Sequence, residues 1–301
     1  MGHRADVGVP AGSNEILIHG VRLAIAREGS GPPVLCLHAI GHGGRDYETF
    51  SSLMRDRYEV IRLDWPGQGR SGSDQEPATP ARYAALLRGV VGALQLEPPI
   101  IIGCSIGGAA AIRYASENPV AGLVLANSGG LVGLTKNTRR ACLLFSRIFA
   151  AGARGAWWYK ALFAQFYRSV LPAPAARDQR QRIVECAYET APVLAEAWRG
   201  FADAAQSDHR ALAIALDVPV LFAWAMQDRI NSFADVEPTI RQMKRAQVVK
   251  FQGGHAAFLE QPEQFAAAFD RFAREILETR DTPALPRIEV ADRIAALGGR
   301  S

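Results

Sequence analysis

The sequence has no long apolar run, and this absence argues against a membrane-spanning helix. Its longest apolar stretch, Ala211 to Met226, is interrupted by Asp217 and Pro219, whereas a spanning helix needs about 20 consecutive apolar residues. Residues 1–13 also contain no apolar run of the kind found in secretory signals. We therefore expect a cytoplasmic protein without a transmembrane segment.

Cysteine is scarce as well, with four in 301 residues. The four are widely spaced, with no Cys-x-x-Cys pair and no paired-histidine pattern nearby, which predicts buried thiols in a reducing compartment. We expect neither a metal nor a cofactor. The net charge of +4 is modest for this length and gives no reason to expect nucleic acid as a partner. The cysteines are Cys36, Cys104, Cys142 and Cys186.

Short runs of branched apolar residues alternate with helical patterns along most of the chain. Hydrophobic residues make up 49% of the sequence, enough for a sizeable core. The alternation predicts the α/β class, with an eight-stranded, mostly parallel sheet flanked by helices and a first antiparallel pair. The predicted strands are Glu15–His19, Val21–Arg27, Pro33–His38, Glu59–Asp64, Pro99–Cys104, Gly122–Ala126, Val218–Ala223 and Gln247–Gln252.

The alternation stops between Ala126 and Val218, where about ninety residues have a helical pattern, far more than a normal connection. We interpret this segment as an inserted helical lid. The predicted organisation is a core of residues 14–128 and 216–280, a lid of residues 129–215 and a tail of residues 281–301, in which Ile288–Leu297 could form a helix. Helices are predicted at Tyr47–Asp56, Arg82–Leu94, Ser105–Asn118, Val236–Arg245 and Pro262–Leu277.

One apolar run ends in the pattern Gly-x-Ser-x-Gly and leads directly into a helix-forming stretch, from Ile100 to Gly108. A serine in such a sharp turn has a strained backbone, and the residues two before and two after it must lack side chains. Gly103 and Gly107 meet this requirement. The turn would present the Ser105 hydroxyl at the carboxyl end of the strand, near the positive end of the next helix. We therefore expect Ser105 to be a nucleophile.

A serine hydroxyl needs a base, and the base needs a group that fixes its tautomer. His255 follows two glycines and the last predicted strand, so it should lie at the same edge of the sheet as the serine. Asp228 follows the preceding strand and gives the chain order serine, acid, histidine. Asp64 also ends a strand, but in a segment typical of a tight structural loop, and Asn127 and Ser128 after the sixth strand cannot replace a carboxylate. We predict His255 as the base and Asp228 as the acid.

Together these motifs resemble the α/β-hydrolase superfamily, in its lid-bearing branch of esterases, enol-lactonases, carbon–carbon bond hydrolases, epoxide hydrolases and haloalkane dehalogenases. The last two attack with an aspartate at the position of Ser105, which argues against both. The resemblance covers roughly residues 21–277 and implies the α/β-hydrolase fold with an inserted lid. It rests on Leu37-His38, Asp64-Trp65-Pro66-Gly67-Gln68-Gly69-Arg70-Ser71, the serine turn, Asp228, and Gly254-His255 followed by Phe258 to Glu263.

The resemblance also implies an oxyanion hole. One donor would be the backbone NH of Ile106, and the other would come from the loop after the third strand, where Ile40 is the best candidate. Most relatives have glycine where this chain has Ala39, and a positive φ there would strain an alanine. His42, on the same loop, is either a substrate contact or an ordinary solvated histidine.

Acyl transfer to water is the chemistry that these residues favour. The first hypothesis is a serine hydrolase acting on a carboxylic ester or lactone of a small to medium apolar substrate. The alternatives are a carbon–carbon bond hydrolase of ring-cleavage products, which the same triad and lid would serve, and a ligand-binding relative without turnover. A small-molecule substrate is expected, whereas its identity and the oligomeric state do not follow from the sequence.

The predicted lid has an unusual charge pattern, because residues 118–177 contain no aspartate or glutamate but several lysines and arginines. Tyr159, Phe163 and Phe166 fall on one face at helical spacing. Either the aromatic residues pack the lid and the cations are solvated, or the aromatics line the acyl pocket while the cations attract an anionic substrate, carrier or membrane surface. The candidate substrate contacts are Trp157, Trp158 and Phe163. The basic residues are Lys136, Arg139, Arg140, Arg147, Arg154, Lys160 and Arg168.

Overall fold

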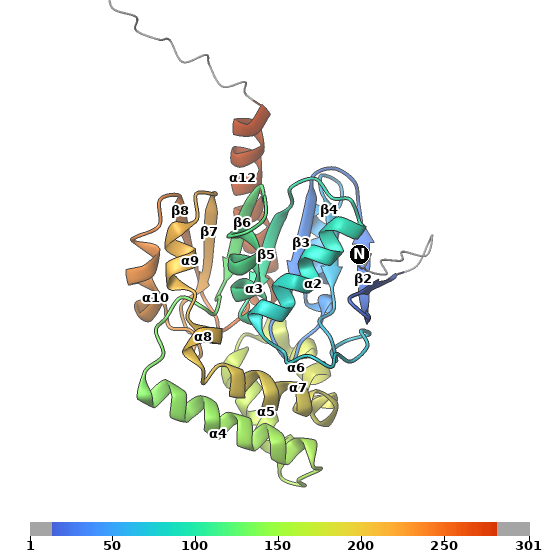
Figure 1. The fold of residues 1–301 in the computed structure, drawn as a ribbon, viewed down its shortest axis with the longest axis vertical. Helices are drawn as coiled ribbons and strands as arrows, with labels where there is room; N and C mark the ends of the chain where they lie inside the picture. The colour runs from blue at the N-terminus through green and yellow to red at the C-terminus, as the bar shows by residue number, and fades with distance from the viewer. Residues whose placement is uncertain (1–13, 282–301) are drawn as a thin grey trace, which may run out of the picture.

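The structure, a computed structural model, describes residues 14–281 and is built around one eight-stranded sheet (Figure 1). The strand order is β1-β2-β4-β3-β5-β6-β7-β8, in which β2 pairs antiparallel with β1 and β4 and all other neighbours are parallel. The predicted mostly parallel sheet with an antiparallel first pair is confirmed. The strands are β1 (Glu15–Ile18), β2 (Val21–Glu28), β3 (Pro33–Leu37), β4 (Glu59–Leu63), β5 (Ile100–Cys104), β6 (Gly122–Ala126), β7 (Val220–Ala225) and β8 (Ala246–Phe251).

The central strands form because their residues are apolar on both faces. Every residue of β5, β6 and β7 is buried, as expected for parallel strands covered by helices on both sides. The edge strand β8 is partly exposed and carries Gln247 and Lys250, polar residues that discourage pairing with other chains. Strand β7 begins at Val220 rather than at the predicted Val218, since Pro219 has no NH to donate to a neighbouring strand.

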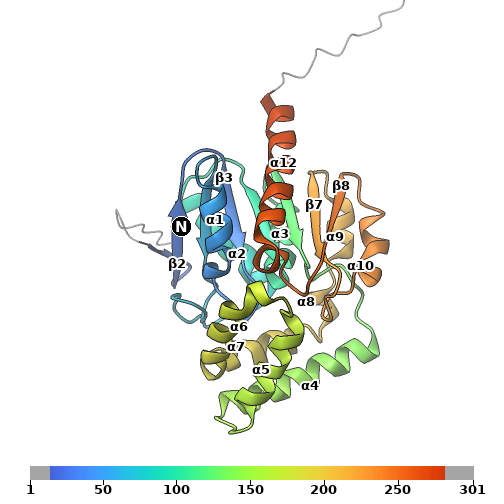
Figure 2. The same ribbon diagram turned by 180° about the vertical axis from the view of Figure 1, so that it is seen from behind.

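Helices cover both faces of the sheet. Figure 1 shows α2 (Pro80–Ala93) and α3 (Ile106–Ala115) on one face, and Figure 2 shows α1 (Glu48–Met54) and α12 (Pro262–Asp281) on the other. Helix α2 begins where Thr79 accepts the Arg82 NH, 3.1 Å away, and where Pro80 has no NH to leave unpaired. A short 3₁₀ helix, η1 (Gly44–Tyr47), precedes α1, and α10 (Phe233–Ile240) precedes β8. The predicted helix Ile288–Leu297 lies outside the described residues.

The segment between β6 and β7 is helical, and its first helices lie beyond the carboxyl ends of the strands (Figures 1 and 2). We call it the helical insertion. Its last helix, α9, returns to the body of the protein and packs against α3. The insertion contains α4 (Lys136–Ala153), α5 (Tyr159–Val170), η2 (Pro174–Ala176), α6 (Arg177–Glu185), α7 (Ala187–Gly200), α8 (Ala204–Ser207) and α9 (Arg210–Ala215). Among residues 14–281, no helix combines the length and apolar character needed to cross a bilayer.

Candidate active site

Ser105 sits in the tight turn between β5 and α3. Its φ of 52° and ψ of −119° form a strained conformation that residues with a side chain rarely adopt. A Cβ atom at Gly103 would lie 2.6 Å from the Gly107 carbonyl oxygen, and one at Gly107 would lie 2.5 Å from the Leu37 carbonyl oxygen. Both contacts are too short, so the turn requires glycine on either side of the serine, as the sequence pattern predicts.

His255 and Asp228 form a buried pair on the loops that follow β8 and β7. The imidazole Nδ1 and the carboxylate Oδ2 are 2.8 Å apart. Burial raises the pKa of the Asp228 carboxyl, but the charge and hydrogen bond of His255, together with backbone NH groups, outweigh it and hold the pKa below its usual value. A carboxylate on Nδ1 leaves Nε2 free to act as a base.

Asn127 supports this pair, and the sequence analysis did not assign it a role. It directly follows β6 with a φ of 43°, and its side-chain amide donates to Asp228 Oδ2 over 2.8 Å. Its amide oxygen accepts the Ala225 NH, so the side chain joins the ends of β6 and β7. The sequence could have indicated this contact, because the two strands were predicted to be parallel. The carboxyl ends of parallel strands lie at the same edge of the sheet, and both residues follow such an end.

Glu260 holds the His255 loop against the helical insertion. Its carboxylate accepts the Gly254 NH at 2.6 Å and the Ala173 NH at 2.9 Å. The His255 NH donates to the carbonyl of Val170, the last residue of α5. The position of the imidazole therefore depends on the docking of the insertion as well as on the sheet.

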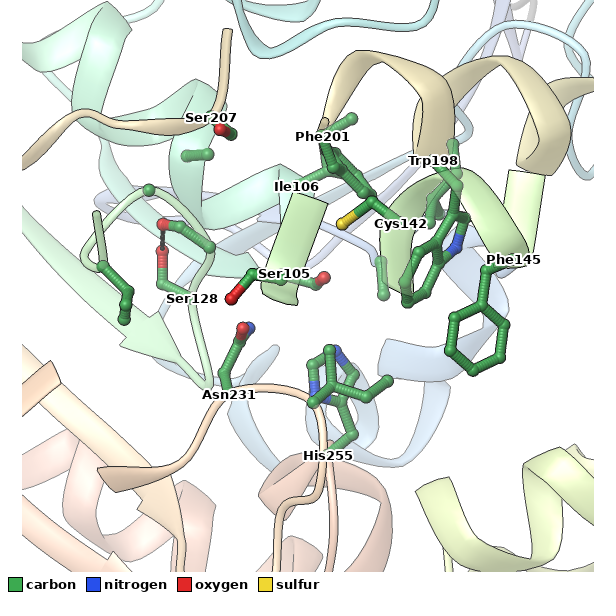
Figure 3. A pocket seen from close by; sticks show the side chains of 18 of the residues that line it. Ser105, Ile106, Ser128, Cys142, Phe145, Trp198, Phe201, Ser207, Asn231 and His255 are labelled. Carbon is green, nitrogen blue, oxygen red and sulfur yellow. Dashed lines mark hydrogen bonds between the residues drawn. The ribbon is translucent and has the colours of Figure 1, made fainter. Parts of the chain in front are cut away.

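Ser105 and His255 line one cavity of about 420 Å³ between the sheet edge and the insertion. Figure 3 shows both side chains and Asn231 facing this space, which the aromatic side chains of Phe145 and Trp198 also approach. No hydrogen bond joins the Ser105 hydroxyl to the imidazole in the part of the chain described. Such bonds are often long until a substrate closes the site. The lining is otherwise mainly apolar.

The loop after β3 borders the same cavity. Ile40 and Ile106 both line it, and the NH of Ile106, the first residue of α3, lacks an intrahelical acceptor. Gln68 holds the loop by accepting the Gly41 NH at 2.6 Å. Gly41 has a φ of 78°, whereas Ala39 is outside the positive-φ region, so the alanine at that position carries no such strain.

Asp64 holds a tight loop together, as its sequence context predicts. Its two carboxylate oxygens accept the backbone NH groups of Gly44 and Arg70, at 2.6 and 2.9 Å. A Cβ atom at Gly69 would lie 2.4 Å from this carboxylate, so the loop wraps closely around it. Asp64 therefore braces the segment that follows β4 and is not paired with His255.

The structure places the predicted aromatic contacts away from the cavity. Trp157 is 88% exposed and Trp158 is 37% exposed, and neither lines it. Phe163 is buried in the core of the insertion, where its ring packs edge to face against Phe149. A ring at the right helical spacing can face the insertion's own core instead of the ligand, and spacing alone does not separate the two. The aromatic residues that do line the cavity are Phe145, Phe166, Tyr167, Trp198 and Phe201.

His42 does line the cavity, together with Ser105 and His255. Within residues 14–281, no group of three or more histidine, cysteine, aspartate or glutamate side chains is arranged to hold a metal ion. The four cysteines are all free, and three of them are buried as expected. The expectation of a buried thiol is wrong for Cys186, which is exposed. The polar groups that line the cavity, Ser105 and His255 among them, can supply a nucleophile and a base.

Comparison with known proteins gives one family and several relatives. A model of the alpha/beta hydrolase family matches residues 34–268. An uncharacterized protein of Mycobacterium tuberculosis is 33% identical over 116 residues, which are 38% of this chain and 34% of that protein, so only about a third of its length is matched. The pimeloyl-[acyl-carrier protein] methyl ester esterase of Stenotrophomonas maltophilia is 27% identical over 271 residues, 81% of this chain and 93% of that protein.

Solved structures share the fold. A thermophilic esterase from Thermogutta terrifontis superposes with a TM-score of 0.72 at 22% identity, over 85% of this chain and 94% of that one. At this level of identity the likeness concerns the fold alone.

Proposed function

Since this chain belongs to the alpha/beta hydrolase family, we propose that it is a serine hydrolase that cleaves a carboxylic ester or a lactone of a small to medium apolar substrate. The observation that carries the proposal is the placement of Ser105 in a strained turn, on the same apolar cavity as a histidine whose Nδ1 is held by a buried carboxylate. This arrangement serves acyl transfer through a covalent intermediate.

In the proposed reaction, His255 Nε2 accepts the Ser105 proton while the serine oxygen attacks the substrate carbonyl. The NH groups of Ile106 and Ile40 stabilise the negative charge that develops on the carbonyl oxygen. His255 then gives the proton to the leaving alcohol, and an acyl-enzyme remains. A water molecule, deprotonated by the same imidazole, releases the acid and restores Ser105. Asp228 stabilises the imidazolium at both steps.

We further propose that residues 129–215 act as a lid on this site. The hydrogen bonds of Val170 to His255 and of Ala173 to Glu260 support this assignment, because the first joins the insertion to the proposed base and the second to the residue that holds its loop. Aromatic residues of α4, α5 and α7 then determine which acyl or alcohol group enters.

A fluorophosphonate probe tests the proposal, because it labels activated serines covalently. We expect Ser105 to be labelled and Ser105→Ala to lose turnover by several orders of magnitude without loss of fold. Ser207→Ala is the matched control, since Ser207 lines the same cavity and donates to the Asp203 carbonyl. Retention of more than about a tenth of the activity in Ser105→Ala would refute the nucleophile assignment.

Substrate panels separate the reaction classes. We expect p-nitrophenyl esters or lactones to be hydrolysed faster than a 2-hydroxy-6-oxo-dienoate, the substrate type of carbon–carbon bond hydrolases. The reverse order would favour the carbon–carbon bond reaction with the same residues. Absence of both labelling and turnover would instead indicate a ligand-binding protein.

A further inference from the structure

The outer face of helix α4 carries a row of cations. Its inner face is marked by the buried residues Cys142, Ser146, Phe149 and Gly152. Because an α-helix has about 3.6 residues per turn, the opposite face is formed by exposed residues that lie three, four or seven positions apart. We call this face the outer stripe, and it consists of Lys136, Arg140, Leu144, Arg147 and Arg154.

No acidic side chain of the same segment balances this charge. Residues 118–177 contain no aspartate or glutamate. None of the four cations of the outer stripe forms an ion pair or a side-chain hydrogen bond with another residue of the described range 14–281. Lys160 is left out of the stripe, because it lies near Cys186 together with one glutamate of α6 and one of α7. The outer stripe therefore presents uncompensated positive charge.

Large apolar side chains are exposed beside these cations. Leu144 lies within the stripe and is 57% exposed. The turn that follows α4 carries the exposed side chains of Trp157 and Trp158, and α5 then exposes Leu162. Neither indole has a ring contact or a side-chain hydrogen bond within the part of the chain that the structure describes. Exposed apolar side chains of this size, gathered at one end of a molecule, mark an interaction surface.

The stripe and the two tryptophans lie at the same end of the protein. Figures 1 and 2 both show α4 and the turn after it at the end opposite to the last turns of α12. The inner side of α4 lines the cavity through Ala141, Cys142 and Phe145. A single helix therefore separates the outer stripe from the cavity that Ser105 lines.

Charge and side-chain type together select the partner. A second copy of this chain would bring one outer stripe against another, and the like charges would repel. Nucleic acid would satisfy the cations but would give the leucine side chains no apolar surroundings. An anionic phospholipid surface supplies both, because its headgroups attract lysine and arginine while tryptophan lies at the boundary between headgroups and acyl chains.

We propose that the outer stripe, together with Trp157 and Trp158, binds the surface of a membrane that contains anionic phospholipid. The cations contact the lipid phosphates, and the two indoles enter the interface. Helix α4 then lies parallel to the bilayer, with the cavity on its other side. This binding does not depend on the reaction at Ser105, so the two assignments are tested separately.

Co-sedimentation of the full chain with lipid vesicles tests the assignment. Vesicles of phosphatidylcholine alone are compared with vesicles of equal parts phosphatidylcholine and phosphatidylglycerol, at low and at high salt. We expect binding to the anionic vesicles that weakens with salt, because salt screens exposed charges. The double variant Arg140→Gln, Arg147→Gln should bind at least about tenfold more weakly, since each cation near an anionic surface adds to the attraction.

The matched control is Lys244→Gln, Arg245→Gln, which removes two exposed cations before β8 and gives the same net charge as the first double variant. We expect this control to bind as the wild type does. An equal loss in both double variants would overturn the assignment, because net charge alone would then explain the binding. Equal binding with and without phosphatidylglycerol, no binding to either kind of vesicle, or binding to a DNA duplex but not to vesicles would also overturn it.

Tryptophan fluorescence provides a second measurement that leaves the arginines in place. Trp65 and Trp224 are buried in the core, and Trp198 lines the cavity. A blue shift of the emission on addition of anionic vesicles therefore reports Trp157 and Trp158. We expect the double variant Trp157→Ala, Trp158→Ala to lose this shift and to bind more weakly, with Tm measured to show that it is folded. A shift that persists in this variant, or binding that stays equal to that of the wild type, would overturn the assignment.

Discussion

Asn127 donates its side-chain amide to the same Asp228 oxygen that binds His255 Nδ1, and both contacts are 2.8 Å long. Asn127→Ala removes this donor and leaves the Ala225 NH without its acceptor. We expect kcat to fall by about tenfold, because a hydrogen bond to a charged group is lost. Steady-state kinetics measure this, with Asn118→Ala as the control, whose amide donates to the Tyr114 carbonyl outside the cavity lining. Equal kcat values for the two variants would count against a positioning role.

Two aspartate-to-asparagine variants separate the catalytic acid from the structural one. Asp228→Asn should lower kcat by on the order of 10⁴-fold, because an amide holds the histidine in the wrong tautomer. Asp64→Asn should mainly lower Tm, since one of the NH groups of Gly44 and Arg70 then faces an amide NH₂. Activity assays and thermal unfolding of both proteins make the comparison. Strong residual activity in Asp228→Asn, with loss in Asp64→Asn, would reverse the assignment.

The pH dependence of kcat/KM should reflect the histidine base and not Asp228. A carboxyl whose pKa is lower in the folded state stabilises that state above about pH 4, and the contribution is lost as pH falls through the folded-state pKa. Asp228, with its lowered pKa, therefore stays ionised across the neutral range. We expect kcat/KM to fall at acidic pH, because a protonated imidazole cannot accept the Ser105 proton. A rate that is flat from about pH 5 to 9 would exclude a histidine base.

The cations of the insertion should act through long-range attraction. None of the eight lysines and arginines in residues 118–177 forms an ion pair with another described residue. Attraction between exposed charges is screened over about 8 Å at physiological salt. We expect these cations to favour anionic over neutral ester substrates, and we expect this preference to weaken at high salt and in an Arg139→Gln, Arg140→Gln double variant.

The control for this prediction is Lys244→Gln, Arg245→Gln, which removes two exposed cations before β8. For the wild type and both double variants, kcat/KM is measured at low and at high ionic strength. If neither salt nor the Arg139 and Arg140 changes alter the preference, the basic face is only a solvated surface as far as the substrate is concerned.

The sheet and the serine turn were predictable because their signals are local. Ile100 to Gly108 contains a buried strand, two obligatory glycines and the start of a helix within nine residues. His255 and Asp228 were assigned from strand ends, and the parallel sheet places them at one edge. Their roles in catalysis remain predictions, whereas their 2.8 Å contact is an observation.

The lining of the cavity was decided by packing between segments far apart in the chain. Phe163 has the helical spacing of a pocket residue, yet it faces Phe149 because α5 packs its apolar face against α4. Trp198 and Tyr167 reach the cavity only through the way in which the insertion docks on the sheet. The pairing of His42 with Asp46 follows a local spacing of four residues, but Gln179 reaches Asp46 from 133 positions away. Sequence periodicity thus determined which faces are apolar, and tertiary packing decided which of those faces meets the substrate.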